Sequence, residues 1–165
     1  MAKLKAWVAW STGKDSAWAL HAVQKHGVFE VTALLTTINA VYDRVAMHAV
    51  RETILDAQAE SVGVPLVKVP IPSPCSNADY EAAMSAAMAR ARAEGVTHVI
   101  FGDLFLEDVR KYREEKLATC TMTPVFPLWG METKTLAREM VDAGLGAYLT
   151  CVDPKKLAGS FAGSL

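Results

Sequence analysis

The stretch AWVAWSTGKDSAWAL, residues 6–20, decides the fold of this chain. Its apolar run Ala6 to Trp10 predicts a short strand, the small polar residues after it predict a turn, and a helical pattern begins at Lys14. A strand, a glycine-containing turn and a helix start in this order direct several backbone N–H groups and the positive end of the helix dipole at one point. Such a point suits a phosphate group.

Two common phosphate-binding loops do not fit this turn. The Walker A pattern requires a glycine, four further residues and then Gly-Lys-Ser or Gly-Lys-Thr. Here Val8 occupies the first glycine position, and Asp15 follows Lys14. The dinucleotide-binding pattern Gly-x-Gly-x-x-Gly also fails, because Gly13 stands alone.

The hexapeptide STGKDS, residues 11–16, resembles the PP-loop (Ser-Gly-Gly-x-Asp-Ser) of the ATP pyrophosphatase superfamily. Members of that superfamily bind ATP, split it between the α and β phosphates and leave adenylate on a substrate. The alternative is a plain βα turn whose serine and aspartate cap a helix. Thr12 departs from the family's usual glycine, and a β-branched residue resists positive φ, so a left-handed Thr12 would strain the loop.

The rest of the chain alternates between strand and helix patterns. Further strands are expected at residues 31–38, 66–71, 97–101 and 122–128, with a last one at 147–152. After the first helix, which closes near Gly27, helices are expected from 47 to 62, from Ser76 or Asn77 to about 94, from 107 to 116, and from 134 to 143 with Thr133 as its cap. Residues 39–46 are expected to form a loop.

This alternation predicts an α/β fold, because right-handed crossovers place helices on both faces of a parallel sheet. The PP-loop resemblance specifies it as a three-layer α/β/α arrangement around a parallel five-stranded, Rossmann-like sheet of HUP type. Residues 1–165 are expected to form a single PP-loop ATP-binding domain. The chemistry should lie at the carboxyl ends of the strands, near the point where strand order reverses.

Composition favours small-molecule chemistry in the cytoplasm. The 165 residues carry a formal net charge of −1, so no broad basic surface points to nucleic acid. The cysteines Cys75, Cys120 and Cys151 are widely spaced, as in a reduced cytosolic protein. No stretch of the sequence is long and apolar enough to span a bilayer, so no membrane partner is expected. A homodimer is left open.

Four later stretches are similar to the diphthine–ammonia ligase family and its bacterial relatives. They are Met47 to Arg51 (MHAVR), Phe101 to Tyr112 (FGDLFLEDVRKY), Pro127 to Gly130 (PLWG), and Cys151 to Gly163. That family adenylates the carboxylate of diphthine on a protein substrate, and ammonia then displaces AMP. Two departures are visible: the sequence ends at Leu165, before the family's glycine- and glutamate-rich C-terminal segment, and Ser164 stands where the family usually has arginine.

The resemblance implies roles for the loop residues. Backbone N–H groups of Thr12, Gly13, Lys14, Asp15 and Ser16 would hold the outer phosphates of ATP, with the Lys14 ammonium balancing their charge. The Ser11 and Ser16 hydroxyls would add hydrogen bonds. Asp15 is assigned to Mg²⁺, with helix-dipole stabilisation as the alternative. Thr36 and Thr37, at the end of the second strand, would meet adenine through backbone groups; the alternative is an ordinary buried strand.

Further candidates lie outside the loop. His48 and Arg51, three residues apart on one expected helical face, would contact phosphate or the acyl group; the alternative is a solvated face. Gly102 would let the backbone approach a ligand, and Asp103 would bind substrate or cap the next segment. Arg110 would stabilise charge at the α-phosphorus, unless it forms a salt bridge to Glu107 or Glu114. Trp129 would form a pocket wall or lie in the core.

Together these observations predict an ATP-dependent, AMP-forming ligase that acts on a carboxylate, small or protein-borne, with ATP and Mg²⁺. Lys14, His48 and Arg110 are its expected catalytic residues. Two alternatives remain open: an adenine-nucleotide-binding module without turnover, and a tRNA-modifying PP-loop enzyme. The second usually carries paired cysteines and basic surfaces, which this sequence lacks.

Overall fold

A β-sheet with helices on both faces forms the first of the two units into which the chain divides. The computed structural model describes residues 2–165; the first unit ends at Gly130, and the second is Met131–Leu165. The strands are β1 (Leu4–Ala9), β2 (Phe29–Asn39), β3 (Arg44–Val45), β4 (Leu66–Ile71), β5 (His98–Ile100) and β6 (Thr123–Val125). The helices of this unit are α1 (Lys14–His26), α2 (Glu52–Val62), α3 (Asn77–Ala93) and α4 (Glu107–Thr119).

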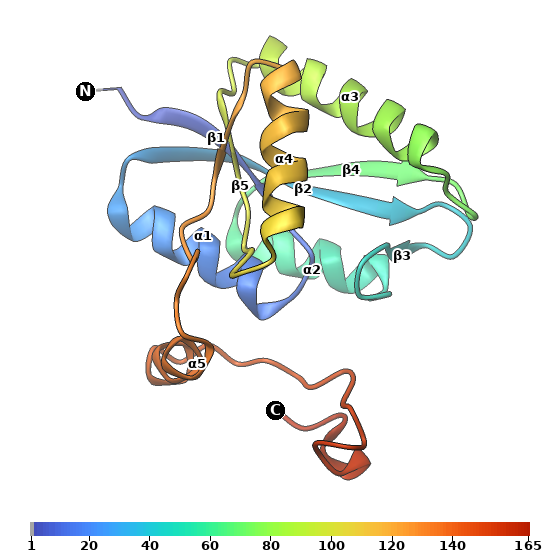
Figure 1. The fold of residues 1–165 in the computed structure, drawn as a ribbon, viewed down its shortest axis with the longest axis vertical. Coiled ribbons are helices and arrows are strands. Elements are labelled where there is room, and N and C mark those ends of the chain that lie inside the picture. Colours follow the sequence, from blue (N-terminus) through green and yellow to red (C-terminus); the bar gives the residue numbers. More distant parts are fainter. Residues whose placement is uncertain (1) are drawn as a thin grey trace. The chain divides into compact units, whose positions relative to one another are not determined.

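The order of the strands puts β1 at the centre of the sheet (Figure 1). From β1 the chain moves outward to β2 and β4, then returns to the other side of β1 to form β5 and β6, and all these neighbours pair in parallel. The strand order therefore reverses between β1 and β5. In an open parallel sheet, this switch point leaves a crevice at the carboxyl ends of the two strands.

Right-handed crossovers place α1 and α2 on one face of the sheet and α3 and α4 on the other. Residues of the second face form a buried cluster in which Trp7, Leu35 and Val99 of the strands meet Met88 of α3 and Leu117 of α4. The alternate residues along the strands, such as Val8 and Leu34, point to the first face and are fully buried. The three-layer, Rossmann-like α/β fold expected from the sequence is confirmed.

Two expectations about residues 39–51 are wrong. Part of the expected loop forms β3, which pairs antiparallel with the end of β2, and α2 begins at Glu52 rather than at Met47. Ala49 has a φ of +52°, which no α-helix tolerates, and Arg51 is extended, with φ −61° and ψ 141°. His48 and Arg51 therefore do not share a helical face.

The second unit differs from the expectation in two places. The helix α5 (Thr133–Asp142) is capped by Glu132, whose carboxylate accepts from the backbone N–H groups of Lys134 and Thr135, and not by Thr133. Residues 147–152 form no strand. In that stretch only Leu149 shares backbone hydrogen bonds with a distant segment, Gly163 and Ser164, next to a short 3₁₀ helix at Gly159–Phe161. A single paired residue cannot build a ladder.

Among the described residues, no helix combines the length and the apolar character needed to cross a bilayer.

Close packing between β5 and α1 depends on Gly102. A Cβ at this position would lie 2.7 Å from the carbonyl carbon and oxygen of Asp15 and 2.9 Å from the nitrogen of Ser16. These are backbone atoms, so they can yield only if the first turn of α1 moves. The missing side chain at residue 102 thus fixes how near the helix start comes to the central strands.

We expect Gly102→Ala to destabilise the protein by about 1–3 kcal/mol, the usual range for overpacking a rigid contact. Urea denaturation followed by far-UV circular dichroism measures the change. The matched control is Gly159→Ala, because nothing lies within 4 Å of a Cβ at that position. Equal midpoints for the two variants would show that the contact with α1 relaxes without cost.

Candidate functional site

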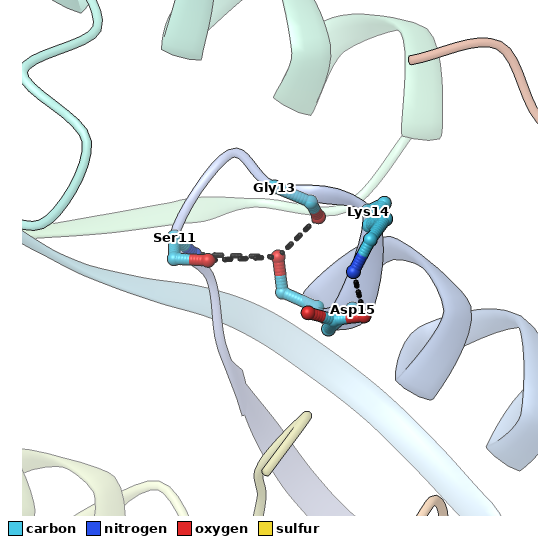
Figure 2. A network of polar contacts seen from close by, with 5 residues as sticks. Ser11, Gly13, Lys14 and Asp15 are labelled. Atoms are coloured by element: carbon cyan, nitrogen blue, oxygen red, sulfur yellow. Dashed lines mark hydrogen bonds and ion pairs between the residues drawn. The ribbon is translucent and has the colours of Figure 1, made fainter. Parts of the chain in front are cut away.

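The turn between β1 and α1 is closed by its two serines. The Ser16 hydroxyl donates to the Gly13 carbonyl at 2.9 Å and lies 3.3 Å from the Ser11 hydroxyl (Figure 2). These contacts join the first and last residues of the loop. The serines thus shape the loop through their mutual hydrogen bonding.

The backbone N–H groups of residues 12–16 make no hydrogen bond within residues 2–165. The first backbone bond of the helix is donated by Ala17 to the Gly13 carbonyl, at 3.2 Å. The start of an α-helix leaves its first donors unpaired, and the helix dipole adds positive potential there. The loop therefore presents a row of backbone donors to an anion.

Thr12 holds the left-handed conformation that the sequence marks as strained, with a φ of +66°. Its hydroxyl donates to the carbonyl of Ser11. From α2, the Gln58 amide nitrogen donates to the Thr12 carbonyl at 3.3 Å, while its oxygen accepts from the Trp10 indole at 3.1 Å. Gln58 thus holds the loop on both sides of Ser11, and no motif in the sequence marks it for that role.

Lys14 and Asp15 pair with each other, with 2.6 Å between the ammonium and a carboxylate oxygen (Figure 2). The side chains are 50% and 37% exposed, and such pairs contribute only about 0–1 kcal/mol. An anion on the loop can therefore draw Lys14 away from Asp15 at little cost.

The loop offers a partial site for Mg²⁺. Within residues 2–165, no group of three or more His, Cys, Asp or Glu side chains could hold a metal ion. Mg²⁺ commonly binds one or two carboxylates and takes its other ligands from phosphate oxygens and water. The Asp15 carboxylate fits a nucleotide-borne Mg²⁺ and does not fit a metal bound by protein alone.

Thr36 and Thr37, near the end of β2, form hydrogen bonds with backbone groups of neighbouring segments. The Thr36 hydroxyl, 2% exposed, donates to the Trp10 carbonyl at 2.8 Å and fixes the end of β1. The Thr37 carbonyl accepts from Ala46 at 2.9 Å, which anchors the segment after β3 beyond the end of β1. This segment passes over the loop. There the Nδ1 of His48 lies 2.7 Å from the Ser11 carbonyl, to which it must donate.

Arg110 and Trp129 contact each other. The Arg110 Nε donates to Glu114 at 2.7 Å, so the expected salt-bridge alternative is present. Its guanidinium also stacks 4.6 Å from the ring centre of Trp129 and 4.9 Å from that of Phe126. The Gly130 N–H donates to the Leu104 carbonyl at 2.8 Å, which joins this group to the segment after β5.

A cavity of about 510 Å³ opens at the switch point. It brings together many of the expected site residues, namely Ser11, Asp15, Ser16, Thr36, Thr37, His48, Gly102 and Asp103. Of the others, Arg51 is the exposed cap of α2. The expected site residues that are not among the described residues lining the cavity are Thr12, Gly13, Lys14, Arg51, Arg110 and Trp129.

Sequence reasoning missed Arg113, which does line the cavity. Its Nε lies 2.7 Å from Asp103 Oδ2, and its guanidinium is 4.3 Å from the ring centre of Phe101. Arg113 precedes Leu117, the buried residue of α4, by four positions and so lies close to the same helical face. Arg110 precedes Leu117 by seven positions and lies near that face as well, so helical spacing alone does not separate the two arginines.

We expect Thr12→Gly to raise the free energy of unfolding by about 0.5–1 kcal/mol. A left-handed conformation costs an ordinary residue about 1–2 kcal/mol, and the flexibility of glycine in the unfolded chain offsets part of the relief. Urea denaturation measures the change in the free energy of unfolding. Thr119→Gly, in the last turn of α4, is the control and should lose stability. Equal losses in both variants would contradict the strain at Thr12.

Comparison with known families agrees with this geometry. The model described as "Diphthamide synthase N-terminal domain" matches residues 4–121, well over half of the chain. A search of curated proteins gives no match. The matched stretch contains the loop, the segment after β3 and α4, and it ends before residues 127–130. The chain therefore belongs to the diphthamide synthase N-terminal domain family, a PP-loop family of ATP-using enzymes related to the ATP pyrophosphatases.

Proposed function

We propose that this protein adenylates a carboxylic acid at the expense of ATP and passes the acyl group to ammonia, forming an amide, AMP and pyrophosphate. The observation that carries the proposal is the row of unpaired N–H groups at residues 12–16. Two of these residues, Asp15 and Ser16, line a cavity at the switch point of a parallel sheet, where such folds bind their ligands. The family uses ATP, which makes a phosphate chain the natural partner of these donors.

The loop residues divide the work of holding the phosphates. The backbone donors and the α1 dipole take the outer phosphates, and Lys14 exchanges its contact with Asp15 for one with a phosphate oxygen. The Asp15 carboxylate would then be free to coordinate the Mg²⁺ that accompanies ATP. His48, held by the Ser11 carbonyl, covers the loop from the side of β3.

The reaction is balanced in two displacements. An oxygen of the acid attacks the α-phosphorus, and pyrophosphate leaves with the electrons of the bond between the α-phosphorus and the bridging oxygen. Ammonia then attacks the acyl carbon, AMP leaves, and the nitrogen loses a proton to solvent. The first step needs its leaving group held and its charge balanced, which the loop and Lys14 supply.

We expect Lys14→Ala to weaken ATP binding about tenfold or more, because the variant loses a charge-assisted contact and tenfold corresponds to about 1.4 kcal/mol. Isothermal titration calorimetry with ATP and Mg²⁺ measures the affinity. The control is Lys25→Ala, which removes an exposed lysine from the last turn of the same helix. An unchanged affinity in Lys14→Ala would place the phosphates elsewhere.

Pyrophosphate exchange into ATP, assayed over a panel of carboxylic acids, tests the chemistry itself. Exchange that depends on an acid and on Lys14 supports adenylation. ATP binding without exchange for any acid would instead favour a nucleotide-binding module without turnover.

A further inference from the structure

The cavity extends from the loop into a space between α3 and α4. We call this space the α3–α4 lobe; it is lined by Tyr80, Met84 and Met88 of α3 and by Tyr112, Arg113 and Leu117 of α4. Tyr80 and Met88 are eight residues apart, which corresponds to about 12 Å of helix. The lobe is therefore about two helical turns long and leads away from the strand ends.

The floor of the lobe is apolar. It consists of Ala9, Leu35 and Val99 from three neighbouring strands, together with the methionines of α3. Burying apolar groups of a ligand against such a surface is favourable, and the surface has no hydrogen-bonding side chains for a sugar or a phosphate. Methionine side chains also adapt to ligands of different shape.

A single guanidinium stands at the end of the lobe near the loop. Arg113 faces Asp103 through its Nε and Nη2, at 2.7 and 3.4 Å, and the Nε contact is a close ion pair that is not aligned as a hydrogen bond. Within residues 2–165, its Nη1 makes no hydrogen bond. The end-on edge of the guanidinium is thus open to a second carboxylate, which a planar fork binds well.

The position of this guanidinium relative to the loop follows from Gly102. The backbone of Gly102 lies against Asp15 and Ser16, and the next residue, Asp103, holds Arg113. The Phe101 ring supports the guanidinium from below. The donors for phosphate and the donors for a carboxylate are therefore set side by side by three consecutive residues, 101–103.

The remaining charges of the lobe are balanced. Lys116 of α4 pairs with Glu81 of α3 at 2.7 Å across the rim, as Arg113 pairs with Asp103. Burial raises the pKa of Tyr80, so its hydroxyl stays a protonated donor at neutral pH. One open guanidinium edge above an apolar floor matches one carboxylate on an apolar body.

We propose that the α3–α4 lobe binds the acid substrate, a small monocarboxylic acid with an apolar chain or ring, and that Arg113 takes its carboxylate beside the phosphate loop. This inference rests on the proposed function, since it names the acid that would be adenylated. It makes Arg113, and not Arg110, the arginine that contacts the substrate.

Calorimetry with defined probes tests the lobe. Octanoate and phenylacetate should bind the wild-type protein. Phenylacetamide, which lacks the carboxylate, and succinate, which has two carboxylates and no apolar body, should bind at least tenfold more weakly than phenylacetate. Arg113→Gln should weaken octanoate binding tenfold or more and change the ATP affinity less than twofold. Arg92→Gln, which removes an exposed arginine of α3, is the matched control and should behave as wild type.

A second variant tests the shape of the lobe without touching the arginine. Met84→Trp places a larger side chain in the lobe and should abolish octanoate binding while ATP binding persists. Thermal melting without ligand verifies that both variants are folded. An Arg113→Lys variant, which keeps the charge and loses the fork, should recover only part of the affinity for octanoate.

Three results would overturn the inference: neither octanoate nor phenylacetate binds, phenylacetamide binds as well as phenylacetate, or Arg113→Gln weakens ATP instead of the acids. The last result would assign Arg113 to the nucleotide. A different set of results would contradict the proposed function. If acids bind through Arg113 but ATP does not bind, or no acid supports pyrophosphate exchange, the lobe stands and the ligase assignment falls.

Discussion

The backbone contact between Gly102 and the first turn of α1 sets the geometry on which the site depends. It brings the end of β5 to the helix start, so that both sides of the switch point face one cavity. Gln58 and Thr36 hold the opposite side by binding the Thr12 carbonyl, the Trp10 indole and the Trp10 carbonyl. Held from both sides, the donors of residues 12–16 can converge without closing hydrogen bonds among themselves.

Local signals were sufficient for the strand–loop–helix unit and for the alternation that defines the fold class. They failed at residues 39–51 because the conformation of this segment is set by its pairing with β2 and not by its own sequence pattern. β1 pairs with β2 only as far as Leu35, so the longer β2 keeps an unpaired edge at Thr37 and Ile38. Buried backbone groups need partners, and β3 with Ala46 supplies them. The helical spacing after Met47 carried no information about this edge.

Tertiary contacts also explain why the sequence indicated Arg110 as a site residue, whereas Arg113 lines the cavity. Both arginines lie in one charged helix, and the resemblance drew attention to the first. Which of them lines the cavity is decided by residues outside the helix. Arg113 contacts Asp103 and Phe101, whereas Arg110 stacks on Phe126 and Trp129. The strand expected at residues 147–152 is absent for a related reason. Its apolar residues suit a strand, but within this stretch only Leu149 forms backbone hydrogen bonds with a distant segment.

The ion pairs Lys14–Asp15 and Arg113–Asp103 differ in burial, which predicts different behaviour when a ligand binds. Lys14–Asp15 is half exposed, so each partner is well solvated alone and the pair can open when phosphate arrives. Arg113–Asp103 has side chains only 24% and 18% exposed, so separating it would leave an unpaired charge in a poorly hydrated place. Arg113 therefore has to bind a ligand while it stays on Asp103, through donors that the aspartate does not use. In our proposal Lys14 moves with the nucleotide, and Arg113 is the fixed point against which the acid is placed.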